Sequence, residues 1–148
     1  VDILSFGGTK QGMLCGEAVI ILKPGLGEEF PYWQKHGMQL ASKMRFISAQ
    51  FEGLLENDLW IENGRHANAM ARLLQESLRR VPGVEVVHPV QANSVFARIP
   101  ADKVEPLQKE TFFWPWDERQ GLVRWMCAFD TRPEDIARFV DTLARVLR

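Results

Sequence analysis

A lysine in a glycine-rich loop is the first residue of this sequence whose surroundings suggest chemistry. Lys10 lies in the run Ser5-Phe6-Gly7-Gly8-Thr9-Lys10-Gln11-Gly12, where glycines let the backbone approach a ligand closely. Ser5, Thr9 and the N–H groups of the loop can bind a phosphate, but the spacing GxxxxGK[ST] of a Walker A loop does not fit. A lysine amine that its surroundings keep neutral forms an imine with a carbonyl. A solvated lysine in a plain β-turn is the alternative, and the more common case.

An arginine inside a predicted strand is the second candidate. Arg124 lies in the run Leu122–Phe129, where alternation places it on one face with Leu122, Met126 and Ala128. A guanidinium on such an apolar face needs an anion nearby, because an unpaired buried charge is costly. Its N–H donors can grip a carboxylate in two places. Spacing alone favours an intrachain salt bridge over a carboxylate of a ligand.

The remaining polar and aromatic candidates favour structural interpretations. The aromatic block 112–116 contains two phenylalanines and two tryptophans, and such a cluster is more often core or domain interface than pocket wall. Cys127 lies on the strand face opposite Arg124, and we expect it to be buried and inert. His66 and His88 have no ligand-type residue at metal-binding spacing, so no metal site is predicted.

Two predicted strands flank the glycine loop and position Lys10. Residues 3–6 form a short apolar run, and residues 17–22 form an almost continuous run rich in β-branched residues, ended by Lys23-Pro24-Gly25. The second run is typical of a strand that is covered on both faces. Because these two strands complete no βαβ unit, we expect the rest of their sheet and its covering helices to lie elsewhere.

The rest of the sequence predicts an α+β layer, with helices packed on one face of a small sheet. Apolar residues at spacings of three and four predict long helices, and apolar alternation predicts strands. The last helix begins at a capping-box pattern. The predicted helices are Gly37–Leu55, Trp60–Val81 (ended by Pro82-Gly83), 102–109 and one starting at 131–134, and the predicted strands are Val84–His88, Ser94–Ile99, Thr111–Trp114 and Leu122–Phe129.

Composition narrows the class of protein and its partners. The chain has 148 residues, 46% hydrophobic and 25% charged, with 18 Lys+Arg against 19 Asp+Glu, which is typical of a compact soluble domain. No basic run points to nucleic acid or a membrane surface, and no apolar run approaches the roughly 20 residues of a membrane span. Cys15 and Cys127 show no CxxC spacing, which predicts reduced thiols in a cytoplasmic protein. Since the chain begins at Val1 without an initiator methionine, we expect it to be part of a longer protein.

Four motifs in order resemble the threonine aldolase and β-eliminating lyase family, which are pyridoxal 5'-phosphate (PLP) enzymes of fold type I. They extend over nearly the whole chain. One departure is Gln11, where the family usually has asparagine. The motifs are Asp2–Gly12 followed by Gly16-Glu-Ala-Val-Ile, Ser42-Lys-Met-Arg-Phe-Ile-Ser-Ala-Gln50, His66-Ala-Asn-Ala-Met-Ala71, and Val123-Arg-Trp-Met-Cys-Ala-Phe-Asp-Thr131.

The resemblance implies specific roles for five residues. Lys10 would be the lysine that carries PLP and then moves protons, while PLP itself acts as the electron sink. Ser5, Thr9 and Arg45 would bind the cofactor. The resemblance also reverses the preference at Arg124, which becomes the arginine that binds the substrate carboxylate. On the predicted helix that contains Arg45, a solvated surface explains Lys43 as well as a role at the site does. His36, at the start of this helix, could reach the site, but capping of a solvated helix end is the favoured interpretation.

The fold class that follows is α/β, the C-terminal part of a fold type I enzyme. Residues 1–24 would end the PLP-binding large domain, 25–58 would link the domains, and 59–148 would form a small α+β domain. The function that the resemblance implies is PLP-dependent cleavage of the Cα–Cβ bond of threonine-like β-hydroxy-α-amino acids to glycine and an aldehyde. The full-length enzyme is expected to be a homodimer or homotetramer. This chain alone should be inactive, because the cofactor's ring-stacking and acidic partners lie upstream of Lys10 in such enzymes. The alternatives are a β-eliminating lyase, a related racemase or decarboxylase, or a non-catalytic α+β interaction domain.

Overall fold

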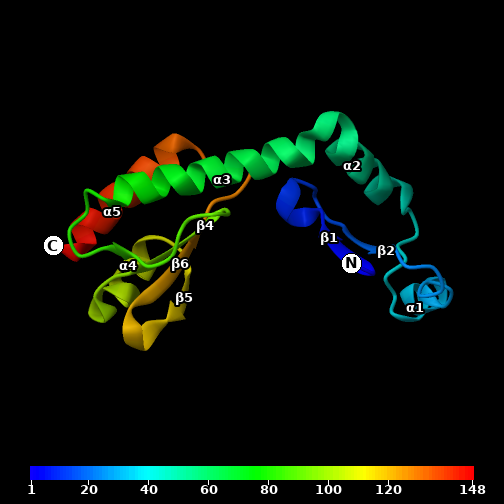
Figure 1. Cartoon of the computed structure of the whole chain (residues 1–148), viewed down its shortest axis with the longest axis horizontal. Coiled ribbons are helices and arrows are strands. Elements are labelled where there is room, and N and C mark those ends of the chain that lie inside the picture. The colour runs from blue at the N-terminus through cyan, green and yellow to red at the C-terminus, as the bar shows by residue number, and fades with distance from the viewer. The chain divides into compact units, whose positions relative to one another are not determined.

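The computed structural model describes all 148 residues and divides into two compact units, residues 1–62 and 63–148. No helix has the length and apolar character needed to cross a membrane. The elements, labelled in Figure 1 where there is room, are β1 (Ile3–Gly7), β2 (Glu17–Ile21), α1 (Phe30–His36), α2 (Arg45–Leu55), α3 (Leu59–Leu78), β3 (Glu85–Val86), β4 (Ser94–Arg98), α4 (Val104–Glu110), β5 (Trp114–Asp117), β6 (Leu122–Met126) and α5 (Pro133–Leu147).

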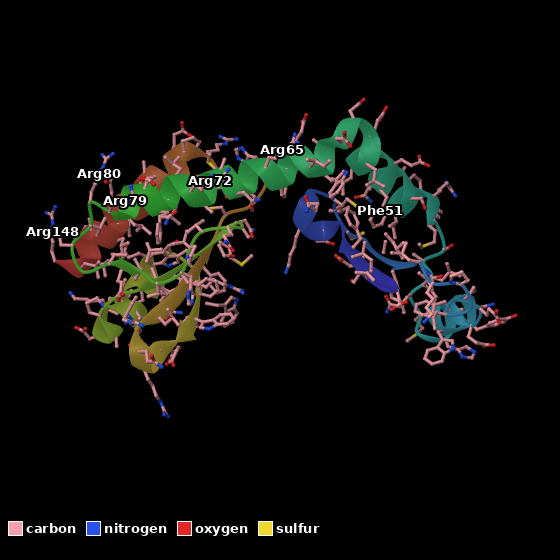
Figure 2. The ribbon with its side chains drawn as sticks, in the orientation of Figure 1. Phe51, Arg65, Arg72, Arg79, Arg80 and Arg148 are labelled. Carbon is pink, nitrogen blue, oxygen red and sulfur yellow. The ribbon has the colours of Figure 1, made fainter.

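The first unit contains an antiparallel pair of strands joined by the glycine loop. β1 and β2 pair from Ile3↔Ile21 to Gly7↔Glu17, so both predicted strands are confirmed. Helix α2 packs beside them, with the Phe51 ring 6.2 Å from that of Phe6, and Figure 2 labels Phe51 on this helix. Most apolar side chains of the two strands are nevertheless exposed, and the buried hydrophobic residues of the unit are Met13 and Leu54. The cover expected on both faces of β2 is therefore not provided by this chain.

The predicted helix over Gly37–Leu55 is wrong in its first half. The structure instead has α1 before this segment and starts α2 at Arg45. The chain turns at Gly37, whose N–H bonds to the Trp33 carbonyl at 2.8 Å, and Met38 has φ of 54°, which no α-helix accommodates. His36 consequently ends α1 and does not begin a helix.

The second unit is the expected α+β layer. Its four-stranded antiparallel sheet has the order β3-β4-β6-β5, and Val95 and Ala97 of β4 pair with Trp125 and Val123 of β6. These four side chains are at most 4% exposed and lie in one core with residues from α3, α4 and α5. Because successive side chains on a strand alternate between faces, the three helices cover one face of the sheet, as predicted.

Helix α3 is amphipathic, as its apolar spacing predicts. Its buried positions Ala67, Ala71, Leu74 and Leu78 recur every three or four residues. Arg65 and Arg72, labelled in Figure 2, are exposed. The helix ends at Leu78, three residues earlier than predicted.

Several of the predicted helices and strands in this unit have different boundaries in the structure. The N–H of Thr111 bonds to the Leu107 carbonyl at 3.0 Å, which closes α4, so β5 begins only at Trp114. The last helix has Arg132 as its N-cap residue, whose N–H bonds to an Asp135 carboxylate oxygen at 3.0 Å. Thr131 turns its hydroxyl toward the loop before the helix instead and accepts the N–H of Ala128 at 2.8 Å. The other strands in this unit are shorter than predicted: β3 is only Glu85–Val86, β4 ends at Arg98 and β6 at Met126.

Candidate functional site

The glycine loop is closed by hydrogen bonds that converge on Gly8. Its N–H bonds to the Gly16 carbonyl at 2.9 Å, and its own carbonyl accepts the N–H groups of Gln11 at 2.9 Å and Met13 at 3.2 Å. These bonds form a short 3-10 turn over Thr9–Gln11. Lys10 is the middle residue of that turn, so its backbone is fixed by groups on both sides.

Gly8 has no space for a side chain. A Cβ there would lie 2.2 Å from Sδ of Met13 and 2.8 Å from the Gly16 carbonyl oxygen. Met13 is 7% exposed and so has little freedom to withdraw. Helix α2 supports the same loop, because the Gln50 side-chain oxygen accepts the N–H of Leu14 at 2.8 Å. The turn that carries Lys10 is thus packed on one side and bonded on the other.

The side chain of Lys10 is exposed and makes no hydrogen bond or ion pair. Thr9 is exposed beside it on the turn. Ser5 lies on β1 opposite Val19, and since side chains alternate along a strand it faces away from Phe6 and the rings that Phe6 contacts. The site therefore presents an unpartnered amine on a rigid turn, with one hydroxyl next to it.

Arg45 is the first residue of α2 and is exposed. Its guanidinium carbon lies 4.8 Å from the ring centroid of Phe46, and it makes no hydrogen bond or ion pair with the loop. The contacts of α2 with the loop come from Ile47, Gln50 and Phe51. The structure thus places Arg45 on the helix that supports the loop but gives it no hydrogen bond or ion pair with Ser5, Thr9 or Lys10. Lys43, just before this helix, is also exposed.

Arg124 lies on the face of the second unit's sheet that the helices leave open. It is half-buried on β6, and its cross-strand partners are Phe96 and Trp114. Its guanidinium carbon lies 5.2 Å from the ring centroid of Trp116. The six ion pairs of the chain all involve other residues. The intrachain salt bridge that spacing favoured is therefore absent, and an aromatic ring lies beside the charge instead.

The aromatic block divides between two environments. Phe113 is 6% exposed and packs against Trp125 in the core, as predicted for the block. Phe112, Trp114 and Trp116 are 58% exposed or more. The contact of Trp116 with Arg124 was not foreseen, because it depends on how two strands pair.

Cys127 and His66 have structural surroundings. Cys127 is 3% exposed, and burial raises the pKa of its thiol to about 11, so the prediction that it is buried is confirmed. His66 on α3 bonds through Nε2 to the Thr131 carbonyl at 2.6 Å, and this nitrogen must carry a proton because a carbonyl only accepts. His88 lies beside the ring of Phe96. No group of three or more His, Cys, Asp and Glu side chains is placed to hold a metal ion.

Comparison with solved structures defines the class of the fold. A threonine aldolase from Leishmania major superposes with a TM-score of 0.83 at 27% identity, over 100% of this chain and 44% of that one. A PLP-dependent aminotransferase from Streptococcus suis superposes with a TM-score of 0.73 at 18% identity, over 99% of this chain, and shows the fold alone. The architecture is thus that of the corresponding part of a PLP-dependent enzyme of fold type I, and the predicted fold class is confirmed.

Comparison of sequences is more specific. No family model matches the chain. It is 44% identical over 148 residues to a low specificity L-threonine aldolase of Pseudomonas aeruginosa and 39% identical over 147 residues to one from another Pseudomonas strain. The chain is therefore similar to threonine aldolases over its whole length, which confirms the resemblance found in the four motifs. It spans about two fifths, 42%, of the length of each of these relatives.

Proposed function

We propose that this chain supplies the cofactor lysine and the small domain of a PLP-dependent aldolase that cleaves threonine-like β-hydroxy-α-amino acids to glycine and an aldehyde. The observation that carries the proposal is the free amine of Lys10 on a turn locked through Gly8. A lysine that is merely solvated on a turn does not require a buried glycine two residues before it. The similarity to threonine aldolases over the whole chain supplies the reaction type.

The residues of the loop fit the cofactor. When bound, PLP would act as the electron sink that stabilises the carbanion left by bond cleavage. Lys10 would hold the cofactor through its amine and, once released by the substrate's amine, would move a proton at the substrate. Thr9 and Ser5 would donate hydroxyl hydrogen bonds to cofactor oxygens, with Arg45 as a further cationic group. The close packing at Gly8 holds the turn still and with it the backbone of Lys10. This matters because reacting atoms must be positioned to within a fraction of an ångström.

Arg124 would bind the substrate carboxylate. Its guanidinium makes no ion pair within the chain and stands on an open sheet face. Arginine binds carboxylates through two parallel N–H···O bonds, which fix the orientation of the amino acid as well as its charge. Lysine in its place would offer a point charge without that orientation.

The remainder of the active site would lie outside this chain, which would form the C-terminal part of the enzyme. In this proposal residues 1–24 end the large domain, 25–58 link the domains and 59–148 form the small domain. A two-stranded sheet is marginally stable by itself, and Val19 and Ile20 of β2 are 53% and 39% exposed. Further strands and helices would cover them. By analogy with the fold class, the whole enzyme would be a homodimer or homotetramer.

Borohydride reduction of the full-length protein with bound PLP, followed by peptide mapping, tests the proposal. We expect a pyridoxyl label on Lys10 and none in the Lys10→Ala variant, while Lys43→Ala keeps the label. A label on another lysine, or none, would overturn the assignment. Product analysis then separates the reactions, since aldehyde plus glycine supports the aldolase, whereas pyruvate and ammonia would show β-elimination. The 148-residue chain alone should bind neither PLP nor glycine tightly.

A further inference from the structure

The open face of the small sheet holds a group of three contacting side chains, Phe96, Trp116 and Arg124, which we call the arginine platform. Arg124 stands opposite Phe96 in the register of β4 and β6. The rings of Phe96 and Trp116 meet edge to face, with centroids 5.2 Å apart and planes at 90°. The guanidinium of Arg124 lies over the Trp116 ring at 5.2 Å. Each member thus touches a neighbour that limits its rotation.

Trp116 lies at a β-bulge of β5. Pro115 pairs with Val123 and Asp117 with Leu122, so Trp116 is the extra residue on β5 and has no partner across the ladder. A bulge bends its strand and redirects a side chain relative to the regular alternation. The neighbouring Trp114 follows the regular register opposite Arg124, yet its ring packs against Phe112 at 5.3 Å.

The contact between arginine and tryptophan leaves the hydrogen-bonding edge of the guanidinium open. A cation–π contact uses the flat face of the group, whereas its five N–H donors point outward in its plane. No hydrogen bond or ion pair of Arg124 with another side chain occupies these donors. An arginine that was held by a carboxylate of its own chain would have lost the same donors to that partner.

We propose that Trp116 is a positioning residue for Arg124. Its indole, supported by Phe96, holds the guanidinium so that the N–H donors stay directed at the carboxylate of an amino-acid substrate. This inference rests on the proposed function of Arg124 and adds the residue that orients it. Without the ring, the arginine side chain gains rotamers that must be frozen again at each binding event. Binding of carboxylate ligands should therefore weaken, by about 5- to 20-fold.

The test uses the full-length holoenzyme and two ligands that share an amine. Glycine carries the carboxylate, and ethanolamine carries a hydroxymethyl group in its place. For Trp116→Ala we expect the Kd of glycine, followed by the absorbance of the bound cofactor, to rise about 10-fold while the Kd of ethanolamine stays within about twofold. The KM for threonine should rise with the glycine Kd, and kcat should change little. Trp116→Phe should recover most of the glycine affinity, because a phenyl ring retains part of the cation–π contact.

Trp114→Ala is the matched control, since it removes a tryptophan from the same strand whose ring packs against Phe112, while the cation–π contact of Arg124 is with Trp116. It should leave both dissociation constants unchanged, and circular dichroism should show that all three variants fold. Trp116 has no such role if Trp116→Ala weakens glycine and ethanolamine equally, if it acts no more strongly than Trp114→Ala, or if the phenylalanine variant is no better than alanine. Arg124→Ala distinguishes failure of the proposed carboxylate site from failure of the positioning role of Trp116. If it leaves glycine binding intact, the proposed carboxylate site itself is wrong, whereas loss of glycine in Arg124→Ala but not in Trp116→Ala overturns only the role of Trp116.

Discussion

Replacing Gly8 with alanine tests whether the packing of the glycine loop holds Lys10 in place. The added Cβ would lie 2.2 Å from Sδ of Met13, which is 1.2 Å short of the 3.4 Å at which ordinary contact begins. It would also lie 2.8 Å from the Gly16 carbonyl oxygen, which accepts the Gly8 N–H. Both neighbours must therefore move, and the second movement loosens the hydrogen bond that closes the loop.

The expected cost follows from these two contacts. Overpacking a tight site destabilises it by about 1–3 kcal/mol, and a weakened hydrogen bond adds about 0.5–1.5 kcal/mol. Alanine recovers up to about 1 kcal/mol by restricting the unfolded chain. The net destabilisation of the loop is about 2 kcal/mol, which corresponds to a roughly 30-fold increase in its open population.

Hydrogen exchange in the full-length protein measures this opening directly. In Gly8→Ala, amides of the peptide over residues 7–16 should exchange up to about 30 times faster, and the affinity for PLP should fall. Gly53→Ala is the matched control, because Gly53 lies in α2 of the same unit and a Cβ there meets nothing within 4 Å. That variant should gain up to about 1 kcal/mol from helix propensity. If Gly8→Ala exchanges and binds PLP like Gly53→Ala, the packing of the loop does not position Lys10.

Three further predictions concern stability and thiol chemistry. At pH 8 a thiol reagent should label exposed Cys15 and spare Cys127, whose burial raises its pKa from 9.0 to about 11, and equal labelling of both native thiols would contradict this. The stability linked to the protonated thiol of Cys127 should be present below pH 9 and be lost as the pH rises toward 11. Leu107→Ala should cost about 3 kcal/mol in urea unfolding, because the side chain is 0% exposed, and a change below about 1 kcal/mol would mean that the site collapses around the cavity. Gly121→Ala should cost at least about 2 kcal/mol, since a Cβ there meets the Ile99 carbonyl oxygen at 2.0 Å at a φ of +63°; wild-type stability would refute the clash.

The second unit could be predicted from sequence because its patterns are local. Alternation along β6 placed Cys127 on the buried face, and periodicity identified α3 and α5. The prediction of one helix over Gly37–Leu55 was wrong because the apolar spacing continues by chance through a turn. Leu40, which lies four residues before Met44 and so continues the apolar spacing of the predicted helix, is 50% exposed. Periodicity records which residues are apolar, and it does not detect a single backbone reversal such as that at Met38.

Sequence patterns could nominate residues for the candidate site but could not predict their contacts. The glycine pattern identified Lys10, and alternation placed Arg124 on the face opposite Cys127. The partner of Arg124 depends on the register between β5 and β6 and on a bulge of one residue. Register is set by pairing between segments that are separate in the sequence, so spacing within one strand could suggest an anion but could not find the Trp116 ring.

The two units differ in how much of their apolar surface they bury, and this difference bears on where activity can arise. All but two of the buried hydrophobic residues, Met13 and Leu54, belong to residues 63–148. The loop with Lys10 thus belongs to the unit with the smaller core, between strands whose apolar side chains remain exposed. A two-stranded sheet of this kind needs further strands or a covering layer to be stable. The hydrogen bonds through Gly8 can fix the turn locally, but they would hold Lys10 in register with the proposed cofactor only if the sheet that carries the turn were itself held in place. We therefore expect that a longer protein with upstream sequence added to this chain binds PLP at Lys10. Substitutions in the second unit of the 148-residue chain should not bring about this binding.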